Sequence, residues 1–383
     1  MHPDLPGGPE GEENERSGPI AANPLVNIVE PTLEGEAGHC RSFLLSICHA
    51  GNVCEVSFRV YGGRGASLPG AEGELCEVVP YFSRRLRRLQ AFLLYRKLLA
   101  GAGRIFVSTA GRTDMVLLDL AAKGEIPPGK VFLYFHWLRS SPRKLVYFRR
   151  FAASHPGVTV LGPTESVIGT FRDCGFRDAR VVPYPITSCA PMTSGTGGAF
   201  RHVLYAGAAR GDKGFPKVVD LVYHMAETGV GIPVTVQASP DHYEKYDEGT
   251  RAELERLRKV SSPWLRMFPD TLGGEEYREM FDGAIVLQPY AREDFADRIS
   301  GVTLDALSAG CPVIATAGTW MARVVKRFDA GRTLEGMSPR EILDAVDAVR
   351  GDYGRYQRNA GVAGRAIQEE HSARHLLSIL SGN

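Results

Sequence analysis

Short apolar runs alternate with longer amphipathic stretches through the first half of the chain. The runs are apolar nearly throughout and contain many β-branched side chains. Such runs are typical of strands that lie buried on both faces of a parallel sheet. The alternation therefore predicts a doubly wound α/β domain. We predict its strands at 25–30, 53–60, 104–110, 130–136, 157–162 and 179–184, with helices between most of them, the first at 39–50.

The same rhythm restarts after residue 200. The segment just before it, 185–200 (PITSCAPMTSGTGGAF), is rich in Pro, Ser, Thr and Gly, which is typical of a linker. Two similar α/β halves in tandem predict a ligand site in a cleft between them. In the second half we predict strands at 202–207, 232–238, 284–290 and 312–316, and helices at 214–228, 247–259, 301–309 and 319–328.

These patterns divide the chain into five parts. Residues 1–22 contain almost no large apolar side chain, so they cannot bury enough surface to offset the entropy of ordering, and we expect a disordered tail. We assign 23–186 to an N-terminal Rossmann-like acceptor domain and 187–200 to the linker. We assign 201–365 to a C-terminal Rossmann-like domain that binds the nucleotide sugar, and we expect 366–383 to be a C-terminal helix that packs back toward the N-terminal domain.

Composition limits the classes of function. Lys and Arg number 45 against 44 Asp and Glu, so no overall field favours nucleic acid, and any basic site is local. The seven cysteines are scattered without CxxC or zinc-type spacing, which favours reduced thiols in a cytoplasmic protein. The N-terminus lacks a signal-peptide pattern, and no apolar run approaches the ~20 residues of a spanning helix. We expect a soluble, cytoplasmic protein without a metal or other cofactor.

The loop after the predicted strand 202–207 carries the first candidate chemistry. Small residues lead from Gly207 to Lys213-Gly214, where a helix opens. A loop of this kind presents backbone N–H groups, a helix N-terminus and the cations Arg210 and Lys213 to an anion such as a diphosphate. It is not a Walker A loop, because GxxxxGK[ST] is absent. The alternative is an ordinary turn with two solvated charges.

A second motif, ADRISGVTLDALSAGCPVIAT (296–316), lies before and within the predicted helix 301–309. Asp297 and Asp305 are separated by seven residues. Ser300 is placed to cap the helix, and the backbone N–H groups of Gly301, Val302 and Thr303 then point at whatever lies above the sheet. Asp305, a turn into the helix, suits a ribose diol, although a solvated helix carboxylate is the alternative.

Together the two motifs resemble the family 4 glycosyltransferases (glycosyl transferases group 1), whose GT-B fold sets two Rossmann-like domains across a cleft. That family has a Gly-Arg…Lys-Gly stretch after the first strand of its C-terminal domain. A Glu-x7-Glu segment follows later and runs into EAMAxGxPVIAT. Lys213-Gly214 and LDALSAGCPVIAT (304–316) match these motifs, and 267–290 fits the spacer between them. The resemblance covers nearly all of 202–350 and, weakly, 25–186.

The resemblance implies a role for each of these residues. Asp297 would lie near the transferred sugar, Asp305 would contact the nucleotide ribose, and Lys213 with Arg210 would neutralise the diphosphate. Fixed cations and helix N–H groups stabilise the charge that develops on a leaving diphosphate, and so replace a metal. The implied catalytic residues are His136, Asp297 and Lys213; the implied donor-binding residues are Gly207, Arg210, Lys213, Gly214, Phe268, Ser300, Gly301, Val302, Thr303 and Asp305.

The chain departs from the family pattern in two ways. Both family glutamates are aspartates here, Asp297 and Asp305, so each carboxylate is one methylene shorter. The arginine that the family places directly after the glycine is Ala208, and Arg210 is offset by two residues. The diphosphate role therefore rests more firmly on Lys213 than on Arg210.

The N-terminal half supplies two further candidates. His136 follows the predicted strand 130–136, where many family members have a histidine that faces the transferred sugar; a structural histidine is the alternative. The loop 30–40 takes the place of the family's glycine-rich first loop, near donor and acceptor. Its Gly35 and Gly38 would let substrate approach. The candidates to bind acceptor hydroxyls are Glu30, Glu34, Glu36 and His39.

One basic segment, FSRRLRRLQAFLLYRK (82–97), is predicted to be a helix. A buried stripe of Phe82, Leu86, Leu89 and Leu93 would face the domain, with arginines on the opposite side. The alternatives are a solvated basic face and a peripheral contact with the anionic inner face of a membrane. The contact would be made by Arg84, Arg85, Arg87 and Arg88.

The sequence thus predicts a GT-B hexosyltransferase of polysaccharide biosynthesis (EC 2.4), implied by resemblance to be retaining and metal-independent. It would move a sugar from a nucleoside-diphosphate donor to a glycan, lipid-linked or small-molecule acceptor. A GT-B epimerase or hydrolase of nucleotide sugars is one alternative, and a catalytically silent GT-B binding or scaffold module is another. A nicotinamide dehydrogenase ranks last, because no GxGxxG follows the first strand.

Overall fold

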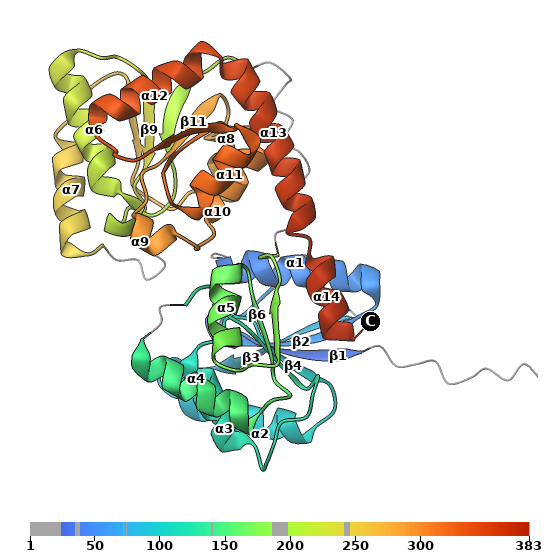
Figure 1. The fold of residues 1–383 in the computed structure, drawn as a ribbon. Helices are drawn as coiled ribbons and strands as arrows, with labels where there is room; N and C mark the ends of the chain where they lie inside the picture. The colour runs from blue at the N-terminus through green and yellow to red at the C-terminus, as the bar shows by residue number, and fades with distance from the viewer. Residues whose placement is uncertain are drawn as a thin grey trace, which may run out of the picture.

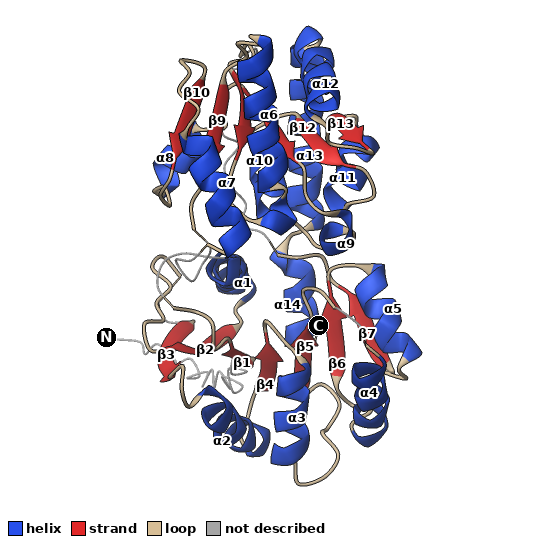
Figure 2. Cartoon of the chain, turned by 90° about the vertical axis from the view of Figure 1, so that its left-hand side faces the viewer, coloured by secondary structure: helices blue, strands red, loops and turns tan. Residues whose placement is uncertain are grey.

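The computed structural model describes residues 24–34, 39–71, 73, 75–138, 141–185, 198–240 and 246–382. It shows two α/β domains, one above the other in Figures 1 and 2, joined near the C-terminus by a long helix. Each domain is built on one sheet with helices on both faces. The expected tail 1–22 and all but the end of the expected linker 187–200 lie outside the described residues.

The named strands of the N-terminal domain form one parallel sheet in the order β3-β2-β1-β4-β5-β6-β7. Helices α2 to α5 pack on one face, and α1 with the last helix of the chain packs on the other. The strands are β1 (Leu25–Val29), β2 (Ser57–Gly63), β3 (Cys76–Phe82), β4 (Arg104–Val107), β5 (Val131–Tyr134), β6 (Thr159–Gly162) and β7 (Asp178–Val181). The helices are α1 (His39–Cys54), α2 (Arg87–Ala100), α3 (Arg112–Ala121), α4 (Pro142–Ser154) and α5 (Glu165–Asp173).

The C-terminal domain repeats this plan with the strand order β10-β9-β8-β11-β12-β13, again parallel. Its strands are β8 (His202–Tyr205), β9 (Val234–Gln237), β10 (Leu265–Phe268), β11 (Ala284–Gln288), β12 (Val313–Thr316) and β13 (Gly331–Leu334). Its helices are η1 (Gly211–Lys213), α6 (Phe215–Thr228), α7 (Glu248–Arg258), α8 (Gly274–Glu279), α9 (Arg292–Phe295), α10 (Gly301–Ser308), α11 (Trp320–Phe328), α12 (Pro339–Gly351) and α13 (Tyr353–Glu370).

The last helix, α14 (Ala373–Ser381), returns to the N-terminal domain (Figure 1). Leu376, Leu377 and Leu380 are buried with residues of α1 and β1 in one apolar cluster. Arg104 donates hydrogen bonds to the carbonyls of Leu380 and, at 3.4 Å, of Ile379, so the helix end is capped. The domain boundary expected at 365/366 falls inside α13, which runs unbroken to Glu370.

The predicted parallel α/β architecture of two Rossmann-like domains is confirmed, but three strands are additional to the predicted ones. These are β3, β10 and β13, and each lies at the edge of its sheet. An edge strand faces solvent and is only partly buried, as the mixed burial of β10 and β13 shows. The apolar run is also interrupted in all three, by Glu77 and Pro80 in β3, by Arg266 in β10 and by Gly331 and Arg332 in β13. At the other strand ends the predicted bounds are a few residues too wide; residues 53 and 54, for instance, end α1 instead of starting β2.

The predicted apolar stripe of the basic segment is wrong. Phe82 belongs to β3 and α2 begins only at Arg87, so the helical spacing counted from Phe82 does not apply. Leu86, Leu89 and Leu93 are 54%, 55% and 50% exposed. The buried face of the helix is Ala91, Leu94, Tyr95 and Leu98.

One close helix crossing gives a prediction about stability. A Cβ at Gly364 in α13 would lie 2.3 Å from the carbonyl oxygen of Leu307 in α10, whereas one at Gly361 would meet nothing closer than 3.8 Å. Gly364→Ala should destabilise the protein by about 1–3 kcal/mol through overpacking. Gly361→Ala, the matched control, should stabilise it by about 0.5–1 kcal/mol because alanine favours helix. Urea denaturation gives the change in the free energy of unfolding for both variants. Equal changes would contradict the close packing of α13 on α10.

Candidate functional site

The candidate site lies at the carboxyl ends of β8 and β11. The strand order reverses between these two neighbours, so the loops that leave them turn to opposite faces of the sheet. Such a switch point leaves a crevice at the carboxyl edge of the sheet, which is where open α/β sheets bind ligands. The two motifs of the sequence both start there, one after β8 and the other after β11.

Gly207 is the point where the two motifs meet. Its φ of +98° suits glycine, and its N–H donates to Oε1 of Gln237 at 2.7 Å. A Cβ at this position would lie 3.2 Å from Nζ of Lys213 and 3.5 Å from Cγ2 of Val302. The glycine therefore lets the lysine of the first motif and the first turn of α10 close over the end of β8.

Gly214 fixes the rest of the loop. Its φ is +70°, and a Cβ would lie 2.0 Å from the carbonyl oxygen of Pro289, the first residue after β11. The N–H of Ala291 donates to the carbonyl of Asp212 at 2.8 Å. The β8 loop thus packs directly on the β11 loop, and side chains of both loops are held at one place.

Three cations surround one carboxylate at this place. Nε of Arg210 donates to Asp212 at 2.8 Å, and its Nη2 bonds the second oxygen. Nη1 of Arg298 lies 3.7 Å from Asp212, and Nζ of Lys213 lies 5.9 Å from the ring centre of Tyr290. Burial, together with the charges of Arg210 and Arg298, lowers the pKa of Lys213 to about 8. This arrangement disfavours charge on Lys213 until an anion binds beside it.

The N-terminus of α10 borders the same point. Oγ of Ser300 accepts from the N–H of Thr303 at 3.4 Å, and Oγ1 of Thr303 donates to Gln288 at 2.8 Å. Both side chains are buried, whereas Gly301 is exposed and has open space where a Cβ would be. The cap predicted at Ser300 is present, and the first turn of α10 leaves Gly301 accessible.

The two aspartates of the second motif have different partners. Oδ2 of Asp305 accepts from the hydroxyl of Tyr277 at 2.9 Å. Desolvation by nearby protein atoms raises the pKa of Asp305 to about 6, and the Tyr277 hydrogen bond acts in the opposite direction, so the carboxyl group is mostly ionised above pH 7. Asp297 instead pairs with Arg323 of α11 at 3.0 Å, a partner that sequence reasoning did not anticipate.

Phe268 ends β10, the edge strand of the sheet. It is half-buried against the apolar cluster that includes α10 and α11, and the guanidinium of Arg266 lies 4.5 Å from its ring centre. β9 and β8 separate it from β11, so it is more distant from the switch point than Lys213 or Ser300.

The N-terminal domain carries a buried polar network at its own switch point, between β1 and β4. Glu30, which follows β1, is 1% exposed. One carboxylate oxygen accepts from the N–H and hydroxyl of Thr32, and the other from the hydroxyls of Ser108 and Thr109 after β4. Sequence reasoning named Glu30 only among several acceptor candidates; its place directly after a buried strand was the one signal for this role.

His136 adjoins this network. Its Nε2 lies 2.7 Å from the carbonyl of Ser108 and 3.4 Å from Oγ1 of Thr109. A carbonyl only accepts, so Nε2 carries a hydrogen, and Nδ1 is the accepting nitrogen of the neutral ring. The rings of Phe43, Tyr134 and Tyr184 surround the imidazole. Gly35 and Gly38, and the side chain of His39, lie outside the described residues.

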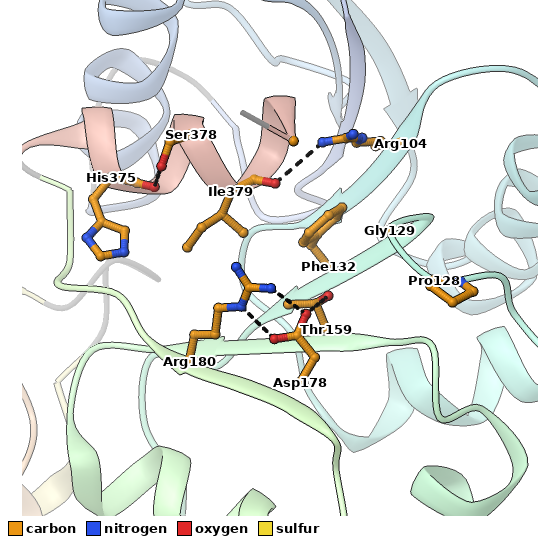
Figure 3. A pocket seen from close by; sticks show the side chains of 11 residues that line it. Arg104, Pro128, Gly129, Phe132, Thr159, Asp178, Arg180, His375, Ser378 and Ile379 are labelled. Carbon is orange, nitrogen blue, oxygen red and sulfur yellow. Dashed lines mark hydrogen bonds and ion pairs between the residues drawn. The ribbon is translucent and has the colours of Figure 1, made fainter.

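A cavity of 560 Å³ lies elsewhere, at the amino ends of β4 to β7 and under α14 (Figure 3). Its arginines are already engaged: Arg180 pairs with Asp178, and Arg104 caps α14. It is on the opposite edge of the N-terminal sheet from the switch point. Among the residues that the structure describes, no group of three or more His, Cys, Asp or Glu side chains is placed to hold a metal ion.

The chain has the GT-B fold, which several solved structures share. WaaG, a glycosyltransferase of lipopolysaccharide biosynthesis, is 14% identical over 93% of this chain and all of its own, with a TM-score of 0.64. Anabaena HepE in complex with UDP-glucose is 14% identical, with a TM-score of 0.67 and coverage of 94% and 99%. Trehalose-6-phosphate synthase OtsA is 10% identical, with a TM-score of 0.66 and the same coverage. No family model and no curated protein sequence matches the chain.

The charges around Lys213 predict a measurable titration. In ligand-free protein the Lys213 ammonium should titrate near pH 8, because burial and two neighbouring guanidinium groups oppose its charge. Asp212→Asn should lower this pKa further, and Arg298→Gln should raise it. NMR of isotope-labelled lysine side chains measures the pKa. The Lys213 signal is assigned as the one that is missing from the Lys213→Arg variant. A titration at the ordinary lysine value would contradict the described geometry.

Proposed function

We propose that this protein is a glycosyltransferase that moves a sugar from a nucleoside-diphosphate donor to a hydroxyl acceptor. The observation that carries the proposal is the meeting of Lys213, Gly207 and the N-terminus of α10 at the switch point. A partly buried lysine beside an accessible helix N-terminus suits a diphosphate group. The GT-B neighbours WaaG and HepE are a glycosyltransferase and a protein solved with UDP-glucose, which supports the same class of donor.

In the proposed reaction the bond between the anomeric carbon and the diphosphate oxygen breaks, and the acceptor oxygen forms the new bond. The acceptor proton passes to the departing diphosphate, and the anomeric configuration is retained. Lys213 and the first N–H groups of α10 stabilise the charge that develops on the leaving group, so no metal is needed. Asp305 binds the nucleotide ribose through its carboxylate, which Tyr277 orients. Asp297 and His136 act near the transferred sugar.

Loss of Lys213 tests the proposal. Lys213→Ala should lower kcat about 100-fold, since one charge-assisted contact to a leaving group contributes about 3 kcal/mol. Release of nucleoside diphosphate from a panel of nucleotide sugars, preselected by thermal shift, gives the rate with and without cell extract as acceptor. Lys217→Ala, an exposed lysine one turn along α6, is the control and should keep full activity.

The same assay separates the alternatives. Release that does not depend on added acceptor indicates a hydrolase or epimerase, and binding without release indicates a silent module. An unchanged kcat in Lys213→Ala would show that Lys213 at the switch point does not stabilise the leaving group. Turnover that stops with EDTA and returns with Mn²⁺ or Mg²⁺ would contradict metal-independent transfer.

We also propose that the protein contacts anionic membranes through the start of α2, which suits a lipid-linked acceptor. Leu86, which precedes α2, and Leu89 and Leu93 within it are exposed, and Arg84, Arg85 and Arg88 beside them are exposed as well. Apolar side chains flanked by cations are typical of a surface that rests at a bilayer interface. No described helix is long and apolar enough to cross a membrane. Arg87 is partly buried and is the least accessible of the four arginines.

Liposome co-sedimentation measures this contact. Binding should require anionic lipid and weaken at high salt, because each basic group near the surface contributes about 1 kcal/mol. Replacing Leu89 and Leu93 with Gln should reduce binding without a loss of stability, since neither is buried. Val362→Gln, an exposed apolar residue on α13, is the control. Equal pelleting with phosphatidylcholine vesicles, or no pelleting with anionic ones, would disprove the contact.

A further inference from the structure

The three cations at the switch point differ in what they already bind. Arg210 uses Nε and Nη2, the edge of the guanidinium that best fits an oxyanion, for both oxygens of Asp212. The side chains of Lys213 and Arg298 have no hydrogen bond to a side chain or carbonyl in the described ranges, and Nη1 of Arg298 lies 3.7 Å from a carboxylate oxygen of Asp212. Two of the three cations thus retain their full donor capacity toward a ligand.

Packing nevertheless holds Arg298 in place. Its guanidinium lies 5.0 Å from the ring centre of Phe295 in α9, and its side chain is 35% exposed. Burial and the charge of Arg210 lower the pKa of Arg298 below its usual range, so the charge of this group is poorly compensated. An anion that bound beside it would relieve this cost.

Arg298 also lies on the correct element. It stands two residues before the Ser300 cap of α10, in the short connection between α9 and α10 that follows β11. Lys213 comes from the loop that leaves β8. Both cations lie near Asp212, so a diphosphate bound there would meet Lys213 and Arg298 together, close to the exposed N-terminus of α10.

The charge balance agrees with such a ligand. Arg210, Lys213 and Arg298 less the Asp212 carboxylate give a net charge of +2 when Lys213 is protonated. A sugar diphosphate carries one negative charge on each phosphate. The Arg210–Asp212 pair is neutral by itself, so Lys213 and Arg298 supply the whole net charge.

We propose that Arg298 is the second cation that binds the donor diphosphate, together with Lys213. Arg210 instead stays paired with Asp212 and borders the site without binding the diphosphate. This inference rests on the proposed function, because it assigns the diphosphate of that donor. The family arginine that would pair with Lys213 is replaced here by Ala208, and Arg210 is offset from it by two residues. Arg298 would supply the missing positive charge. The substrate class that this inference specifies is a nucleoside diphosphate or its sugar ester.

Calorimetry with UDP, GDP and ADP, each compared with its nucleoside, tests the assignment in the full-length protein. For the nucleoside diphosphate that binds, Arg298→Gln should lower the affinity about 10- to 100-fold. The affinity for the corresponding nucleoside should not change. Arg298→Lys should recover part of the loss. The double variant Arg210→Gln/Asp212→Asn keeps the net charge and should bind within about threefold of the original protein.

The controls separate the ways in which this can fail. Arg292→Gln removes an exposed arginine on α9, where it pairs with Glu335, and should change nothing. If Arg298→Gln binds like the original protein while Lys213→Ala and the double variant both lose the diphosphate, Arg210 is the partner cation and the inference is wrong. If Lys213→Ala has no effect either, or no nucleoside diphosphate binds, the proposed function fails and the inference fails with it.

Discussion

The close approach of two loops over the end of β8 sets the geometry of everything else at the candidate site. It is possible only because Gly207 and Gly214 have no Cβ, since a methyl group at either position would press on Lys213 or on the carbonyl of Pro289. With the loops in contact, the cations of one loop lie beside the helix N-terminus of the other. Desolvation then lowers the pKa of Lys213, because it destabilises the charged ammonium group. A bound anion would stabilise that charge again.

The electrostatics of this point differ from those of the molecule as a whole. The chain is nearly neutral, with 45 basic and 44 acidic residues, yet three cations share one carboxylate at the switch point. A local excess of charge among partly buried groups is screened less than charge on the surface. This contrast favours a site for a small, highly charged ligand over a broad electrostatic surface.

The switch point of the N-terminal domain carries the opposite charge. It holds a buried carboxylate, Glu30, whose oxygens accept from hydroxyl and amide donors of two loops. The loop after β4 also contacts His136, whose Nε2 lies 2.7 Å from the carbonyl of Ser108. The last helix, α14, completes the apolar core of this domain, so the chain crosses between domains twice.

The sequence by itself determined the two-domain parallel architecture, because central strands are apolar on both faces and leave an unambiguous pattern. It also predicted the cap at Ser300, because the capping hydroxyl and the N–H from which it accepts lie only three residues apart in the chain. Tertiary structure decided the rest. The apolar runs of the edge strands β3, β10 and β13 are interrupted by charged residues, proline or glycine, and the exposure of Leu89 and Leu93 depends on where α2 begins. Arg298 and Arg323 have no local signal at all, because their roles depend on Asp212 and Asp297, which approach them only when distant loops and helices pack together.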